Sequence, residues 1–308
     1  MSGSKAPESC GRAPVSGSEA RVSGREVRVS GREVRLLTLV LIAVCALLVG
    51  PSAPSGAGSP PPEPARDIVP NRVMTWNICN PCEESNVHRA AEIARFAPQV
   101  IGLQEACVRD VEQIREHLRS LHGLVYHVEY GPVLRDWSRC GGAPWRPGAY
   151  GQALLSAAPM RDVVNTEYPD GGSEDRGYLA VTTTVDGRSV RVINTHLAQR
   201  RQQPVRAGQI RVLAAVVSRH DRAIVLGDFN SVPDAPELTP LWDLAEDANP
   251  ACHPSGTDTG TGTCETTTDW LTRFDYVFLR GGITALGHGV HQTRYSDHDL
   301  VHADLDTA

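Results

Sequence analysis

The sequence predicts an α/β (α+β) fold in which two mixed β-sheets pack against each other and helices cover the outside. From about Ile68 to the C-terminus, short apolar runs alternate with amphipathic segments. Some neighbouring runs, such as 179–185 and 190–195, are close enough to form hairpins. No linker long enough to divide this region interrupts it, so we expect a single domain over residues 68–308.

The elements of this domain follow from local patterns. Nine segments have the length and residue types of strands: 72–78, 100–104, 124–130, 152–156, 179–185, 190–195, 223–226, 274–279 and 300–304. Three segments have helical periodicity: 87–96, 108–121 and 205–220. Asn86 is expected to be the N-cap of the first helix.

The N-terminal part of the chain has the pattern of an export signal. Arginines precede an apolar run at 36–49, which is 14 residues long and shorter than the roughly 20 residues that span a bilayer. Small residues follow up to Ala57, as at a cleavage site. We therefore expect a signal segment at 1–57, a Pro/Gly/Ser-rich linker at 58–67 and a secreted, extracellular protein. An uncleaved membrane anchor is the alternative.

The cysteines favour disulfides over a zinc site. The chain has eight cysteines, and the six that follow the predicted signal segment are an even number, as expected in an oxidising compartment. Cys252 and Cys264 flank a Gly/Thr loop and are expected to pair. The other four, which can pair in three ways, are Cys79, Cys82, Cys107 and Cys140. Cys79 and Cys82 have zinc-ligand spacing, but no second such pair lies near them, so zinc is the weaker alternative.

The charge of the chain limits the class of partner. The formal net charge is −6, and without residues 1–57 it is about −9. A protein that neutralises many phosphates is usually basic, so tight non-specific binding of nucleic acid is disfavoured. Turnover of a phosphate ester at a metal ion is not excluded, because the ion supplies local positive charge.

Polar side chains stand at the ends of several predicted strands. They are Asn77, Glu105, His196, Asp228 with Asn230, and Asp275. A single polar residue at such a place usually marks the point where a strand reaches water, so the joint occurrence is what indicates a site. Asp228 and Asn230 are two residues apart and can face one ligand while Phe229 faces the core.

Seven short blocks occur in order between about residues 70 and 305: TWNI, GLQE, YGQALLS, NTHL, GDFN, RFDYVFL and SDHD. With this combination the chain resembles the endonuclease/exonuclease/phosphatase superfamily, which includes DNase I-like nucleases, abasic-site endonucleases, bacterial sphingomyelinases and inositol-polyphosphate phosphatases. The resemblance implies a four-layered, DNase I-like α/β sandwich. It also implies a hydrolase of phosphate esters that depends on Mg²⁺, or alternatively Mn²⁺.

The resemblance and the preference of Mg²⁺ for oxygen ligands assign the metal site. Glu105 would be the primary ligand, and Asn77 and Asp297 would complete or support the site. The cation would polarise a phosphoryl oxygen and stabilise the charge that develops during attack.

The resemblance also assigns the groups that move protons. His298 would help to activate the attacking water, and Asp275 would hold its other ring nitrogen. Asp228 is the competing candidate for the base. Asn230 would position the phosphate or the nucleophile, and His196 would donate to a phosphate oxygen or to the leaving group.

Three further residues are expected near the substrate. Tyr150 stands where the family often has a tyrosine that contacts phosphate, although packing is an equal alternative. Arg176 and Asn194 are expected to contact substrate. One position departs from the family: DNase I-like nucleases carry a glutamate two residues after that tyrosine, and this chain has Gln152. An amide cannot supply the same negative charge to His196, which puts a DNase I-like acid step in doubt.

The substrate is less well defined by the sequence. Trp137 and Trp145 could stack on bases or touch a lipid surface, unless they pack in the core. Arg200, Arg201 and Arg206 could meet phosphates, unless they only begin a solvated helix. All four phenylalanines fall in predicted core elements, which disfavours a lipase with an exposed apolar hairpin. We therefore expect a monomeric nuclease acting on DNA or RNA, with a sphingomyelinase-like phospholipase C or an inositol-phosphate phosphatase second and a non-catalytic binding domain last.

Overall fold

The structure is a computed structural model that describes residues 67–80, 82, 85–255 and 263–307. The expected signal segment, and the linker apart from Asp67, lie outside these residues. The described residues form two six-stranded sheets and one two-stranded sheet. None of the described helices is long and apolar enough to cross a membrane.

The first large sheet has the order β13-β14-β1-β2-β6-β3. Its strands are β1 (Val69–Asn77), β2 (Pro98–Cys107), β3 (His127–Arg135), β6 (Ala149–Ser156), β13 (Thr284–His291) and β14 (Leu300–Asp306). Strands β1 and β2 are parallel, and the other neighbours are antiparallel. The sheet is therefore mixed, and it joins the first described strand to the last.

The second large sheet has the order β11-β12-β10-β9-β8-β7. Its strands are β7 (Arg161–Glu167), β8 (Gly177–Val185), β9 (Arg188–His196), β10 (Ala223–Asp228), β11 (Glu246–Asp247) and β12 (Asp275–Arg280). Here β9 and β10 are parallel and the other neighbours are antiparallel. Two short strands, β4 (Gly142–Ala143) and β5 (Arg146–Pro147), form the small sheet.

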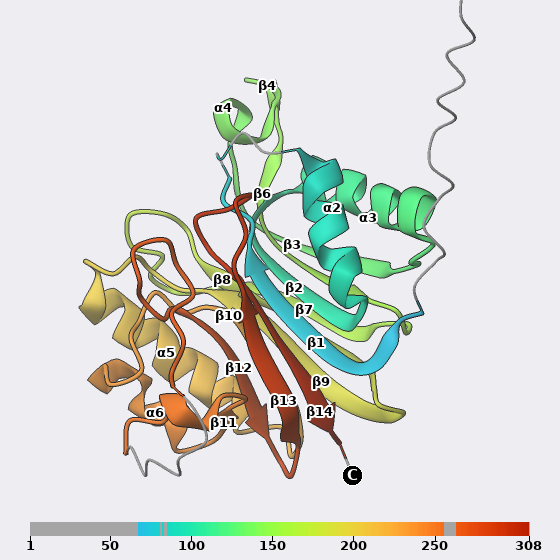
Figure 1. Cartoon of the computed structure of the whole chain (residues 1–308). Coiled ribbons are helices and arrows are strands. Elements are labelled where there is room, and N and C mark those ends of the chain that lie inside the picture. The colour runs from blue at the N-terminus through green and yellow to red at the C-terminus, as the bar shows by residue number, and fades with distance from the viewer. Residues whose placement is uncertain (1–66, 81, 83–84, 256–262, 308) are drawn as a thin grey trace, which may run out of the picture. The chain divides into compact units, whose positions relative to one another are not determined.

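Helices cover the outer face of each large sheet, so the domain has four layers (Figure 1). The helices are α2 (Asn86–Phe96), α3 (Val108–His122), α4 (Trp137–Cys140), α5 (Gln203–Val217) and α6 (Thr239–Trp242), with short 3₁₀ turns at Pro236–Leu238 and Pro250–Cys252. Ile93 and Ile114, from α2 and α3, pack with Leu103 of the first sheet. Leu213 of α5 packs with Phe278 of the second sheet.

Branched apolar side chains from both large sheets fill the space between them. They include Val73, Val100, Leu154, Val192, Leu226 and Val301, all almost completely buried. Burial of such side chains removes apolar surface from water and is the main favourable contribution to folding. The predicted four-layered α/β sandwich is thus confirmed.

Besides the two-residue strand β11, two strands of the large sheets are not predicted by the sequence pattern. Strand β7 is almost entirely exposed, and Val163 and Val164 both face solvent. Strand β13 contains Gly287 and Gly289 and is only partly buried. Both are edge strands, where one side of the ladder lacks a partner and apolar alternation is weak.

The helix boundaries differ slightly from the expected ones. The N-cap of α2 is Ser85 and not Asn86, because the Ser85 hydroxyl accepts a hydrogen bond from the Val87 amide at 3.3 Å. The Asn86 side chain instead donates to Asp110 at 3.0 Å, which ties α2 to α3. Helix α5 begins at Gln203, with Pro204 in its first turn, two residues before the expected start.

Three disulfides join the six cysteines. The expected pair Cys252–Cys264 is confirmed. The other pairs are Cys79–Cys82 and Cys107–Cys140. The zinc alternative is wrong for Cys79 and Cys82, because a disulfide leaves no thiolate to bind a cation.

Candidate active site

The second sheet brings three of the predicted residues to one level. Strand β9 ends at His196, which pairs in register with Asp228 at the end of β10. Asp228 in turn pairs with Asp275, the first residue of the antiparallel strand β12. The three side chains, whose joint occurrence at predicted strand ends indicated a site, therefore lie at the same edge of the sheet.

The first sheet supplies Asn77 and Glu105 to the same edge. Asn77 is the last residue of β1, and it pairs with Gln104 of the parallel strand β2. Glu105 lies where the β2–β6 ladder shifts register between Leu103 and Ala106, and its φ is 51°. A bulge of this kind turns a side chain out of the pleat, and non-glycine residues in this region cluster at functional sites.

Asn77 connects the two sheets at the site. Its Nδ2 donates to Glu105 Oε1 at 3.2 Å and to Asp228 Oδ2 at 3.1 Å. Its Oδ1 accepts a hydrogen bond from the Cys79 amide at 3.0 Å. In this orientation Asn77 holds the two carboxylates and does not present its amide oxygen to a cation.

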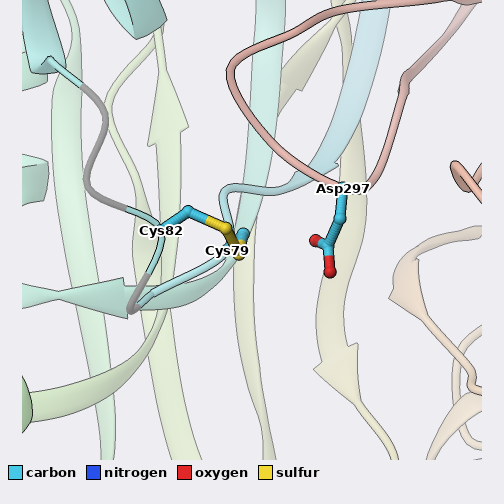
Figure 2. Close-up of side chains that lie close together, drawn as sticks. All are labelled: Cys79, Cys82 and Asp297. Carbon is cyan, nitrogen blue, oxygen red and sulfur yellow. A yellow bond between two sulfur atoms is a disulfide. The ribbon is translucent and has the colours of Figure 1, made fainter.

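The turn after Asn77 fixes that orientation. Cys79 has a φ of 49° and is bonded to Cys82. The Arg89 guanidinium donates to the carbonyl of Ile78 at 2.8 Å, which anchors the turn to α2. Figure 2 shows the disulfide close to Asp297, whose carboxylate oxygen lies within 4.8 Å of both sulfur atoms.

His298 lies between two carboxylates. Its Nδ1 is 2.8 Å from Asp275 Oδ2, and its Nε2 is 3.7 Å from Asp228 Oδ2. Thr267 donates to the same Asp275 oxygen at 2.7 Å. Because all of these side chains are buried, His298 is held in one orientation.

His196 and Asn230 form the adjoining part of the site. His196 Nε2 is 3.1 Å from Asn230 Nδ2 and 3.3 Å from Asp228 Oδ2. The backbone of Asn230 is also left-handed, with a φ of 50°, and its amide donates to Asp228 Oδ1 at 2.8 Å. Asp228 therefore receives contacts from both sheets and from both histidines.

Burial and neighbouring charges set the protonation of these groups. Burial raises the pKa of Asp228 above its usual range, and also that of Glu105. Burial alone would lower the pKa of His298, but the adjacent Asp275 and Asp228 outweigh it and raise that pKa well above the usual value. Burial and the Arg176 guanidinium hold the pKa of His196 well below its usual range. These shifts favour the imidazolium form of His298 and the neutral form of His196 near neutral pH.

These residues line an open cavity of about 320 Å³. Its walls are Glu105, Arg176, His196, Gln199, Arg200, Arg201, Asp228, Asn230, Trp270, Phe274, Asp297 and His298. Ligand pockets usually measure roughly 300–1,000 Å³, so the cavity has room for one phosphate group and a small part of what is attached to it.

The donor set of the cavity suits a hard divalent cation. Glu105 and Asp297 both present carboxylates to it and are only partly buried. Asp228, Asp275 and His298 also lie close enough together to ligate, but the contacts described above occupy them with one another. Mg²⁺ needs only one or two carboxylates and keeps several waters, so Glu105 and Asp297 offer donors of the type that it prefers.

Of the other predicted residues, Arg176 reaches the cavity, and Tyr150 and Arg206 do not. Arg176 lines the cavity and is held by an ion pair with Glu174, which also binds Arg139 at 2.7 Å. Tyr150 does not line the cavity, and the Arg139 guanidinium lies 4.3 Å from the centre of its ring. Arg206 is buried in an ion pair with Glu237 at 2.6 Å, so it cannot meet a phosphate.

Asn194 does not reach the cavity, which corrects its expected contact with substrate. It is fully buried between the sheets, where Nδ2 donates to the carbonyls of Leu103 and Ala153, each at 2.9 Å. Its Oδ1 accepts from Gln104 at 2.6 Å. The side chain therefore joins the second sheet to the first.

Asn194→Ala is expected to lower the free energy of unfolding by about 2–4 kcal/mol, because buried carbonyls lose their hydrogen-bond donors. Chemical denaturation measures the change. Asn165→Ala is the matched control, since that exposed side chain donates only to the carbonyl of Pro132. A value for Asn194→Ala within about 0.5 kcal/mol of the parent protein would contradict the cross-sheet role.

Three residues at the site were not predicted from the sequence. Thr267 supports Asp275 from a run of three threonines, and Glu174 holds Arg176 from a loop. Trp270 lines the cavity from the loop before β12 and meets the His298 ring edge-on at 5.5 Å. A tryptophan five residues before the DYVFL strand could have drawn attention to that loop.

The sequence also matches a known protein family. The model of the Endonuclease/Exonuclease/phosphatase family matches residues 74–298, and the chain belongs to that family. No curated protein matches the chain.

Solved structures share the fold at low sequence identity. D. rerio TDP2 complexed with a single strand DNA product is 17% identical with a TM-score of 0.61, covering 77% of this chain and 98% of that one. An endonuclease/exonuclease/phosphatase from Beutenbergia cavernae is 24% identical with a TM-score of 0.60, covering 76% and 70%. The human Nocturnin catalytic domain with a bound sulfate anion is 22% identical with a TM-score of 0.57, covering 77% and 93%.

Proposed function

We propose that the protein is a divalent-metal-dependent hydrolase of phosphodiesters, and that its substrate is nucleic acid. The observation that carries the proposal is the group of His298, Asp228 and Glu105 at one edge of the two sheets, within one open cavity, with the buried Asp275 bonded to His298. Acidic and imidazole side chains with shifted pKa values in a cleft are typical of catalytic sites.

A divalent cation held by Glu105 and Asp297 would supply polarisation of a phosphoryl oxygen. Asn77 keeps Glu105 in place through its 3.2 Å hydrogen bond. Arg176, Arg200 and Arg201 add positive charge to the cavity wall, which offsets the acidic character of the chain where a phosphate would lie.

Proton transfer is divided between Asp228 and His298 in this proposal. Both ring nitrogens of His298 face carboxylates, so its stable form is the imidazolium, which can donate to a phosphoryl oxygen but cannot act as a base. Asp228, whose burial raises its pKa toward neutrality, accepts the proton of the attacking water. This reverses the order of the two candidates expected from the sequence. His196 and Asn230, which lie beside Asp228, would contact the phosphate.

Export is part of the proposal and is supported by the three disulfides, which form and persist in oxidising compartments.

A phospholipase C is the second candidate, supported by Trp137 and Trp145. They are 53% and 87% exposed on the segment that carries α4, β4 and β5, and could touch a lipid surface. They do not line the cavity, so the nuclease remains the first candidate.

The proposal is tested by incubating the protein with a single-stranded oligonucleotide, plasmid DNA, sphingomyelin vesicles or an inositol phosphate, each with Mg²⁺, Mn²⁺ or EDTA. We expect Mg²⁺- or Mn²⁺-dependent cleavage of the nucleic acids. Cleavage of sphingomyelin alone would favour the phospholipase, and nucleic acid hydrolysis undiminished by EDTA would refute the metal requirement.

A further inference from the structure

Trp270 is the one large aromatic side chain of the cavity wall that is also substantially exposed among the described residues, with 47% of its surface accessible. Its ring meets His298 edge-on, at 5.5 Å between ring centres and 86° between planes. Its ring centre also lies 6.3 Å from that of the buried Phe274. One part of the indole is therefore fixed against the site, and the rest is open to a ligand.

Hydrogen bonds within the loop that carries Trp270 fix the shape of the loop. Within the loop, the Leu271 amide donates to the Thr268 carbonyl at 2.9 Å, and the Thr272 amide donates to Thr268 Oγ1 at 3.1 Å. Leu271 has a φ of 59°, a conformation that persists in a non-glycine residue only when its surroundings enforce it. The indole is thus presented by a tight turn.

The loop is also joined to the segment before β14 that contains His298. Thr268 and His298 form an antiparallel β-bridge, and the Asp269 amide donates to the Asp297 carbonyl at 3.0 Å. The position of Trp270 relative to the reacting phosphate is therefore set by the same backbone that sets His298. A rigid aromatic surface at a fixed place beside a phosphate site is suited to stacking on a base.

We propose that Trp270 is a specificity-determining residue that stacks on an unpaired base next to the scissile phosphate, so that the enzyme prefers single-stranded nucleic acid. The inference rests on the proposed phosphodiesterase activity. A paired base presents only its edge, because its faces are covered by its neighbours in the duplex. An unpaired base can expose a face to the indole.

The exposed arginines of the cavity favour a nucleotide over a choline headgroup, which an indole could also bind. Arg200 and Arg201 line the same cavity and are exposed, as is Gln199 beside them. Guanidinium groups repel a quaternary ammonium and bind the phosphates that flank a base.

The experiment compares kcat/KM of the parent protein, Trp270→Ala and Trp270→Phe on three substrates. These are a single-stranded oligonucleotide, the same sequence in a duplex, and an oligomer of base-free deoxyribose phosphates. Stacking contributes roughly 1–3 kcal/mol per base, so Trp270→Ala should lose about 5- to 150-fold on the single strand. The loss should be mainly in KM, should be small on the base-free oligomer, and should be partly restored in Trp270→Phe.

Trp145→Ala is the control, because Trp145 is 87% exposed but does not line the cavity. It should keep the parent's preference for the single strand. A second measurement needs no turnover: in EDTA, the oligonucleotide should quench more fluorescence in the parent than in Trp270→Phe.

Equal losses on the base-bearing and base-free strands would overturn the inference, because Trp270 would then only support His298. A loss confined to sphingomyelin would overturn it in favour of choline recognition. If the parent protein cleaves all nucleic acids with no dependence on bases, only this inference fails. If it cleaves no phosphodiester, the proposed function fails as well.

Discussion

Glu105→Gln is expected to abolish Mg²⁺-supported hydrolysis to the same extent as EDTA. The substitution removes the anionic ligand while keeping nearly the same shape, so the chain should stay folded and Asn77 should keep an acceptor. Loss of a cation that stabilises the transition state by about 4 kcal/mol corresponds to a fall of about 10³-fold in kcat/KM.

Binding of the cation gives a readout independent of turnover. Calorimetric titration with Mg²⁺ or Mn²⁺ should show weaker binding to Glu105→Gln than to the parent protein. The matched control is Glu112→Gln, since Glu112 is exposed on α3 and does not line the cavity. Unchanged cation affinity in Glu105→Gln would assign the metal to other residues.

His298→Ala is expected to lower kcat by roughly 10²–10⁴-fold, the usual contribution of a group that transfers or shares a proton in the transition state. The effect on KM should be smaller, because the imidazolium acts on the charge that develops during attack. Asp275→Asn should be milder, since the amide still bonds Nδ1 through its oxygen but no longer balances the imidazolium charge.

His127→Ala is the control for this pair, because His127 is exposed on β3. Circular dichroism should show that all three variants are folded. A folded His298→Ala protein with near-normal kcat would contradict the assignment and leave Asp228 as the group that carries proton transfer alone.

The sequence predicted most of the frame because the central strands are continuous apolar runs. The segment that forms β10 is a short apolar run that ends at Asp228, and in the structure all of its residues are buried. The strand-end residues of the second sheet could be predicted to meet because parallel strands β9 and β10 end at the same edge. Edge strands such as β7 lack that apolar signal.

The parts of the site that could not be predicted depend on tertiary contacts. Asn194 lies two residues before His196 on the same strand, so its sequence position suggests the site. Its side chain instead bonds to carbonyls of the first sheet, and this contact cannot be predicted from the strand alone. Arg206 looks like a surface charge until Glu237 is brought to it by the turn after β10. Trp270 reaches the cavity through a turn with a left-handed residue, and no periodicity predicts such a turn.

The pairing of β1 with β14 ties activity to completion of the chain. Arg72 lies opposite Asp304 in this ladder, so the first described strand gains its neighbour only when the last has been made. A nascent or clipped chain that lacks the segment from Thr284 onward would keep Glu105 and Asp228, yet would lack His298 and leave one side of β1 without a partner. Contacts so distant in sequence form late and slowly. On this reasoning a chain that stops short of β14 is inert, and the proposed capacity to cut phosphate esters arises only once both ends of the sheet have met.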